Sequence, residues 1–115
     1  MERLTRALSI RQPLIELILT GKKTWEFRSR TTHIRERVYL YASKALAQVE
    51  GFDPMKAAAL PRGVIVGSVE IIDVLPDEDG DLDGQWGWEL ARPRRYRVPL
   101  QPQGIPQPGF WHPKF

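Results

Sequence analysis

Three charged side chains within six residues could bind an anion or transfer a proton. They are Lys23, Glu26 and Arg28, and Glu26 and Arg28 stand two positions apart. Because residues two apart share one face of a strand, this carboxylate and guanidinium are expected to lie together. Lys23 follows a predicted helix end and could point into the same space, where a lysine and a glutamate could act as base and acid. The alternative is a structural ion pair of Glu26 with Arg28 or Lys23.

Three polar residues that precede this segment suit a nucleotide. Arg11 lies at a predicted strand-to-helix turn, and its guanidinium could hold a phosphate through two hydrogen bonds. Ser9 and Gln12 flank it and offer neutral donors and acceptors for the edge of a base. Together these side chains are of the kind that a polar cleft would contain.

A second basic cluster consists of Arg92, Arg94, Arg95 and Arg97. Arginines at this density could contact a nucleic-acid backbone outside the cleft. A solvated strand face explains the same pattern, and both interpretations stay open.

Aromatic side chains alternate along several predicted strands. Trp25, Phe27 and Trp88 could stack on bases, but aromatics at alternating positions of a small barrel usually form its core, and we predict core positions for them. Tyr39 and Tyr41 share one face of their strand, where core packing and base stacking are equally open.

Composition excludes several classes of protein. The chain has 115 residues, 42% hydrophobic and 27% charged, which predicts one folded domain over residues 1–115. Cysteine is absent, which removes disulfides and thiolate nucleophiles. No apolar run reaches the ~18 residues of a membrane span. The first residues also lack the apolar core of a signal peptide, so we expect a cytoplasmic protein without a membrane partner.

Charge is distributed unevenly along the chain. The net charge is +3, although five acids fall within residues 77–83, so the rest of the chain is strongly basic. A basic body fits a polyanionic or nucleotide partner. The acidic segment lacks the spacing of a calcium loop, and His33 and His112 stand alone, so we expect no metal and no cofactor.

Hydrophobic periodicity and turn residues predict short elements. Strands are expected over residues 6–10, 24–28, 37–42, 64–74, 85–90 and 95–100. Helices are expected over 13–19, 44–50 and 53–60, the first ending at a left-handed Gly21. The proline-rich tail from Gln101 is predicted to be irregular, with Phe110 and Trp111 packing down. Many short strands with two or three short helices predict an α+β fold built as a small barrel.

Several segments of the chain resemble those of a known family. Gly21, Lys23, Glu26 and Arg28 match the G-x-K-x-x-E-x-R signature of the ASCH family, and the chain resembles that family further in the following segments. These are residues 9–13 (SIRQP), 40–44 (LYASK), 60–67 (LPRGVIVG), 86–88 (WGW), 93–95 (PRR) and 108–111 (PGFW). The resemblance implies a PUA-like β-barrel with a cleft between the first helix and the barrel. It also implies binding of RNA, DNA or modified nucleosides. Some members of the family are amidohydrolases that act on acylated cytidine, and others are described as ribonucleases.

Residues and resemblance together predict a nucleic-acid or nucleotide-binding domain, RNA-related, that binds in this basic cleft. The expected binding residues are Ser9, Arg11, Gln12, Lys23, Glu26, Arg28, Arg94 and Arg95. The alternative is a hydrolase that acts on RNA or on an acylated or modified nucleoside through Lys23 and Glu26. The expected partner is accordingly RNA, another single-stranded nucleic acid or a modified nucleoside, and the oligomeric state stays open.

Overall fold

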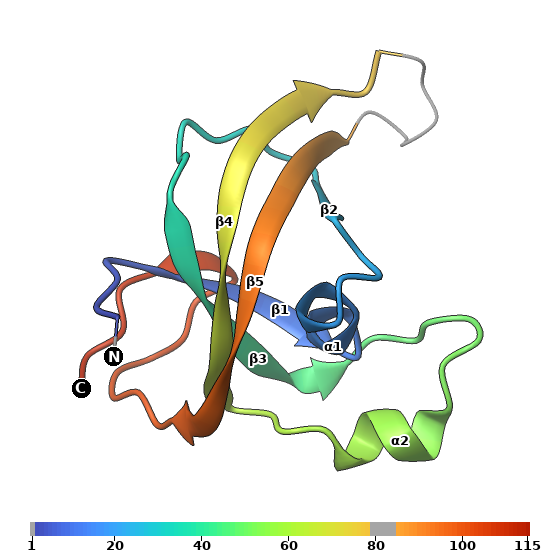
Figure 1. Ribbon diagram of the computed structural model, residues 1–115, viewed down its shortest axis with the longest axis vertical. Coiled ribbons are helices and arrows are strands. Elements are labelled where there is room, and N and C mark those ends of the chain that lie inside the picture. The colour runs from blue at the N-terminus through green and yellow to red at the C-terminus, as the bar shows by residue number, and fades with distance from the viewer. Residues whose placement is uncertain (1, 79–84) are drawn as a thin grey trace.

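In the part of the chain that the structure describes, six strands form one strongly curled sheet with two short helices beside it (Figure 1). The computed structural model describes residues 2–78 and 85–115. The elements are β1 (Ala7–Gln12), α1 (Leu14–Leu19), β2 (Trp25–Arg28), β3 (Arg37–Leu46), α2 (Pro54–Ala59), β4 (Val64–Pro76), β5 (Trp86–Leu100) and β6 (Gly109–Trp111). The predicted α+β small-barrel fold is confirmed, as a half-barrel.

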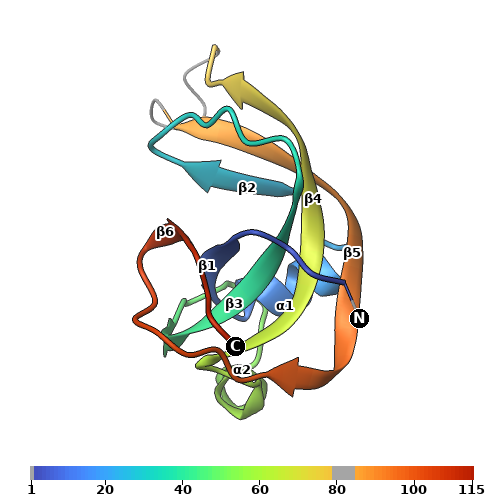
Figure 2. The same ribbon diagram turned by 90° about the vertical axis from the view of Figure 1, so that its left-hand side faces the viewer.

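The strand order is β2-β5-β4-β3-β1-β6, and β1 pairs with β3 in parallel. In the described part of the chain the two edge strands, β2 and β6, do not pair with each other, which leaves a seam between them (Figure 2). Side chains cross this seam. Arg28 Nη2 donates to the carbonyl of Ser9 over 2.9 Å, and the Trp88 ring stacks on Phe110 with centroids 5.4 Å apart.

The sheet has apolar side chains on both faces of its middle strands. The concave face carries the larger core, which includes Leu8, Ile15, Leu40, Val69 and Trp88. A second cluster lies on the opposite face of β1 and β3 and consists of Ala7, Tyr39, Tyr41, Ile65 and Trp111. Because the middle of β1 and β3 is covered on both faces, residues 7–10 of β1 and residues 38–42 of β3 are buried without a break.

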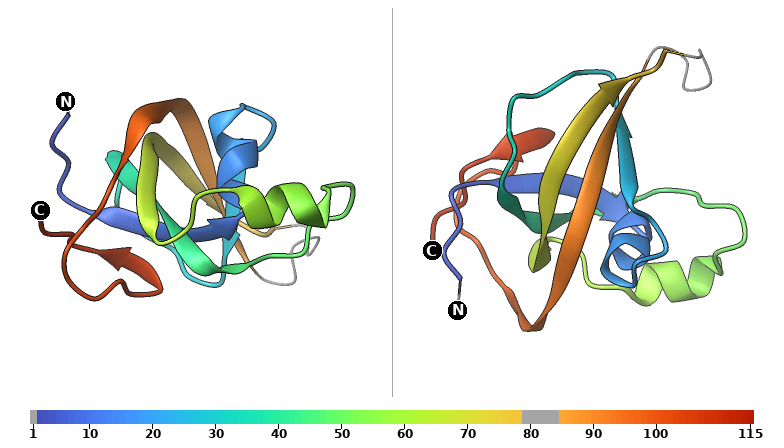
Figure 3. Two further views of the ribbon diagram at one scale, coloured as in Figure 1. Left: turned by 90° about the horizontal axis from the view of Figure 1, so that it is seen from below. Right: turned by 45° about the horizontal axis from the view of Figure 1, so that its top comes forward.

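Helix α1 covers the concave side near β1 and β5, whereas α2 stands away from the sheet (Figure 3). Ile15 and Ile18 are buried, as the apolar periodicity predicts. Gly21 has a φ of 79°, which confirms the left-handed residue expected after the helix. The amides of Lys22 and Lys23 both donate to the carbonyl of Leu17, so the chain turns sharply before β2.

The predicted helix over residues 44–50 is wrong. β3 continues to Leu46, which pairs with Gln12 of β1 after a bulge, and the amide of Ala47 donates to the carbonyl of Gln12. Pairing with β1 therefore outweighs the local preference for helix in this segment.

The two strands predicted over 85–90 and 95–100 are one strand, β5. Arg92 has a left-handed φ of 51°, and the register with β4 shifts between Ser68 and Glu70. This irregularity accommodates Pro93, which has no amide hydrogen for the ladder. The tail also differs from the prediction, since Gly109–Trp111 pair with β1 as β6.

The prediction that Trp25 and Phe27 of β2 are core residues is wrong. Trp25 is half-buried and Phe27 is 42% exposed, whereas the Glu26 between them is buried. Trp25 and Phe27 instead lie against Gly87, which has no side chain to displace them. The core position of Trp88 is confirmed, and both tyrosines of β3 are buried in the second cluster.

No helix in the described ranges is long and apolar enough to cross a membrane. Residues 2–78 and 85–115 also contain no group of three or more histidine, aspartate or glutamate side chains that could hold a metal ion. Most of the acidic segment 77–83 lies outside the described residues.

Candidate nucleotide pocket

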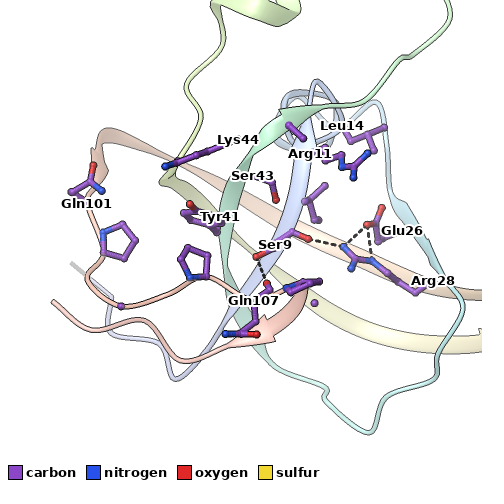
Figure 4. A pocket seen from close by; sticks show the side chains of 18 residues that line it. Ser9, Arg11, Leu14, Glu26, Arg28, Tyr41, Ser43, Lys44, Gln101 and Gln107 are labelled. Carbon is purple, nitrogen blue, oxygen red and sulfur yellow. Dashed lines mark hydrogen bonds and ion pairs between the residues drawn. The ribbon is translucent and has the colours of Figure 1, made fainter.

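A pocket of about 710 Å³ opens between the seam and the proline-rich tail (Figure 4). Its lining comes from three regions of the chain, the seam, the end of β3 and the tail. The residues are Ser9, Ile10, Arg11, Leu14, Glu26, Arg28, Tyr41, Ser43, Lys44, Ala45, Gly63, Gln101, Pro102, Gly104, Pro106, Gln107, Pro108 and Gly109. Three cations face a single carboxylate in this set, so the pocket favours anions.

Glu26 and Arg28 form the charged end of the pocket. Arg28 Nη2 lies 2.8 Å from Glu26 Oε2, and its Nε donates to the same oxygen over 3.0 Å. Lys23 Nζ lies 3.5 Å from Glu26 Oε1, so both carboxylate oxygens have a cationic neighbour. The Glu26 side chain is only 7% exposed, and this pairing compensates its burial. The predicted structural pairing is present, and it also fixes Arg28 at the pocket wall.

Ser9 joins the pocket to the tail. Its hydroxyl donates to the carbonyl of Gln107 over 2.8 Å and accepts from Trp111 Nε1 over 3.0 Å. Its own carbonyl accepts from Arg28. Ser9 therefore anchors one wall, and its hydroxyl is already engaged on both sides.

Arg11 and Lys44 differ from Arg28 in having no fixed partner. Within residues 2–78 and 85–115, neither side chain makes a hydrogen bond or an ion pair. The stem of Lys44 lies over Gly63, whose φ is 74° and whose missing side chain leaves that space open. Arg62 Nη1 donates to the carbonyl of Lys44 over 2.9 Å and holds its backbone. The pocket lining therefore contains two cations whose charge no described side chain compensates.

The structure brings together four of the eight predicted binding residues, Ser9, Arg11, Glu26 and Arg28, in the pocket lining. Lys23 adjoins Glu26 but points over the ring of Phe27, at 5.2 Å from its centroid, outside that lining.

The other three predicted residues lie elsewhere. Gln12 is 1% exposed, and its amide group serves the backbone: Nε2 donates to the carbonyl of Pro61 and Oε1 accepts from the amide of Glu16. Arg94 and Arg95 lie on β5, outside the pocket, where they pair with Glu2 and Glu16 respectively.

Sequence reasoning missed the far wall of the pocket. Ser43 and Lys44 reach it because β3 runs on past residue 42, where the predicted strand ended, and Tyr41 of the predicted strand lines the same pocket. Burial raises the pKa of Tyr41, so its hydroxyl stays a neutral donor. The repeated prolines of the tail were a usable signal, because they favour an extended, pre-ordered strap that can form a wall.

The curled sheet defines a small α+β barrel domain, and its pocket is lined by three cations and one carboxylate. A family model described as the ASCH domain matches residues 8–96, and the chain belongs to this family. The ASCH domain is a PUA-like domain generally associated with RNA binding. No curated protein matches the chain. The tail wall of the pocket, residues 101–109, lies beyond the family match.

Proposed function

We propose that the pocket binds a nucleotide of single-stranded RNA or a modified nucleoside. One observation carries this proposal. Arg11 and Lys44 line the pocket without an ion-pair or hydrogen-bond partner among the described residues, and neutral polar groups lie in the same lining. Phosphate contacts by cations position a nucleic acid, and neutral donors and acceptors read a base. The volume of about 710 Å³ is within the range of small-molecule sites.

The roles of the pocket residues follow from their contacts. Arg11 and Lys44 bind phosphate oxygens, because their own charges are not compensated by the protein. Glu26 lies at the charged end and can accept a hydrogen bond from a base amino group. Arg28 holds Glu26 and the Ser9 carbonyl, so it positions the site.

A binding titration tests the proposal. Arg11→Ala and Lys44→Ala should each weaken binding of fluorescent single-stranded RNA, and each lost phosphate contact should reduce the log–log salt slope by roughly 0.7. Lys56→Ala is the matched control, since Lys56 is exposed on α2 and removes the same charge outside the pocket. Absence of binding at low salt, or an equal loss in the Lys56 variant, contradicts the proposal.

The second candidate is a hydrolase acting on RNA or a modified nucleoside, and the Lys23–Glu26 pair at 3.5 Å favours it. It takes second place because Lys23 lies outside the pocket lining and both Glu26 oxygens already have cationic neighbours. Product analysis of the same RNA and of an acylated cytidine separates the candidates. Turnover that disappears in Glu26→Gln would support the hydrolase.

A further inference from the structure

A second anion-binding arrangement lies on the face of β4 and β5 that carries Tyr96, and the chain itself occupies it. The carboxylate of Glu2 accepts hydrogen bonds on Oε2 from the hydroxyls of Ser68 and Tyr96. Its Oε1 lies 2.6 Å from Arg94 Nη1 and 4.0 Å from Arg37 Nε. One oxygen thus lies between two hydroxyls and the other between two guanidinium groups.

This receptor is built into the sheet. Ser68 is fully buried on β4, where it pairs with Tyr39 on one side and Arg94 on the other. Its hydroxyl also accepts from Arg37 Nη1 over 2.9 Å, which directs the hydroxyl hydrogen toward Glu2. A buried polar side chain in the middle of an apolar strand requires a partner, and here the partner is the anion.

Arg37 is fixed before any ligand arrives. Its Nη2 donates to the carbonyl of Arg92 over 2.7 Å and lies 3.4 Å from Glu70. The Arg37 side chain is 10% exposed, whereas the Arg94 side chain is 60% exposed. One guanidinium therefore forms a rigid back wall, and the other can adjust to the ligand.

The carboxylate that occupies this receptor sits on a short arm. Residues 2–6 belong to no helix or strand, and their N-terminal end lies beside β5 (Figure 2). Leu4 anchors the arm, because its amide donates to Tyr39 Oη over 3.1 Å and its side chain packs on the second cluster. Glu2 can leave the receptor by a movement of the residues before Leu4, while the anchor stays in place.

We propose that the Ser68–Tyr96–Arg37–Arg94 receptor binds a phosphate group, and that Glu2 occupies it as a built-in competitor. A phosphate reproduces the two oxygen positions of the carboxylate, and its other oxygens can extend into the open depression beside it. That depression, of about 700 Å³, is lined by Glu2 and residues 94–98. Arginine and hydroxyl donors are suited to phosphate, because its oxygens accept several charge-assisted hydrogen bonds.

Inorganic phosphate is the first probe, followed through the amide resonances of Ser68, Arg94 and Tyr96. In Glu2→Ala the dissociation constant should fall about tenfold, as expected if the carboxylate occupies the receptor nine-tenths of the time. Glu2→Gln, which keeps the side-chain shape, should produce a change in the same direction. Tyr96→Phe combined with Glu2→Ala should abolish the gain, since it removes one hydroxyl and keeps the packed ring.

Glu16→Ala is the matched control. It raises the net charge by the same amount and frees Arg95, which Glu16 holds at 2.8 Å, but it exposes no hydroxyl pair. An unchanged phosphate affinity in both Glu2 variants, or an equal gain in Glu16→Ala, overturns the proposal. A gain confined to the Glu2 variants and lost with Tyr96→Phe supports it.

Single-stranded RNA is the second probe, and it distinguishes binding of free phosphate from binding of a backbone phosphate. Only this second experiment rests on the proposed function. If the receptor takes a backbone phosphate, Glu2→Ala tightens RNA binding, and the gain persists in Arg11→Ala. If Glu2→Ala raises the affinity for inorganic phosphate but not for RNA, the receptor binds free phosphate. Failure of RNA binding with the phosphate gain intact therefore rejects the proposed function and leaves this inference standing.

Discussion

Glu26 is a buried carboxylate that lies between two cationic side chains. Its buried carboxylate touches both Arg28 and Lys23, so Glu26→Gln leaves two cations with a weaker partner. We expect this change to lower the free energy of unfolding by about 1–3 kcal/mol, the usual cost of removing one partner from a buried polar contact. Urea denaturation at neutral pH measures it.

The control for this prediction is Glu16→Gln, which breaks the more exposed pair with Arg95. Exposed pairs contribute ~0–1 kcal/mol, so the control should lose less than the Glu26 variant. Equal losses in the two variants would show that burial of Glu26 contributes nothing.

The Glu2 carboxylate should make the free energy of unfolding depend on pH in the acidic range. Burial would raise its pKa, but the hydrogen bonds from Ser68, Tyr96 and Arg94 and the charge of Arg37 together lower that pKa below its ordinary value of 4.5. A carboxyl whose pKa is lower in the folded chain stabilises it at pH values above the ordinary pKa, and the contribution is lost as the pH falls through the folded value. The difference in unfolding free energy between the wild type and Glu2→Gln should therefore be present at pH 7 and shrink at pH values below 4.5. A difference that stays constant down to pH 3 would contradict this linkage.

Among the elements, the paired strands β4 and β5 approach each other closely at Gly67. A Cβ on Gly67 would lie 2.2 Å from the backbone oxygen of Arg94, so the strands would have to separate. Gly67→Ala should cost about 3 kcal/mol or more, at the upper end of overpacking effects. Thermal or urea denaturation measures the loss.

Gly87→Ala provides the comparison, because its nearest neighbour is the side chain of Trp25 at 3.1 Å. A side chain can shift by a few tenths of an ångström where a backbone cannot, so the cost should be about 1 kcal/mol. If Gly87→Ala costs as much as Gly67→Ala, the backbone contact between Gly67 and Arg94 is no more rigid than the side-chain contact of Gly87 with Trp25.

The elements show which parts of the fold local sequence could predict. The helix before Gly21 and the long strand β4 were predictable because periodicity, stop residues and β-branched content agree there. The segment after Ser43 was not, since its extended form depends on pairing with Gln12, far away in sequence. Alternation in β2 correctly separated Trp25 and Phe27 from Glu26 and Arg28, but it could not say which set faces inward. Burial of the charged set requires the Lys23 and Arg28 contacts, which only the folded chain provides.

On the scale of the whole molecule, side chains rather than backbone pairing hold the seam together. Phe110→Ala removes the ring that stacks on Trp88 and should cost about 2–4 kcal/mol. Phe110→Leu keeps an apolar side chain without the ring and should cost about 1 kcal/mol. Hydrogen exchange should show earlier loss of protection in β2 and β6 than in β4 for the alanine variant. Uniform loss across all strands would mean that the seam opens only with global unfolding.

The candidate site could be predicted only in part for a related reason. Residues near one another in sequence, from Ser9 to Arg28, contribute one side of the pocket, and motif spacing found most of them. The other side comes from the end of β3 and from the tail, which the curl of the sheet brings together. No local pattern connects Lys44 with Gln107, so only the folded molecule shows that they share a wall.

The order of the strands has a consequence for how the protein is made. β1 lies near the start of the chain, yet one of its two partners is β6, and Ser9 meets Trp111 across a separation of 102 residues. During synthesis, β1 leaves the ribosome roughly 5–20 s before β6 does. Throughout that interval one edge of β1 has unpaired backbone groups, which other chains could join. β6 therefore both extends the sheet beyond β1 and covers the edge of β1 that would otherwise stay open to other chains.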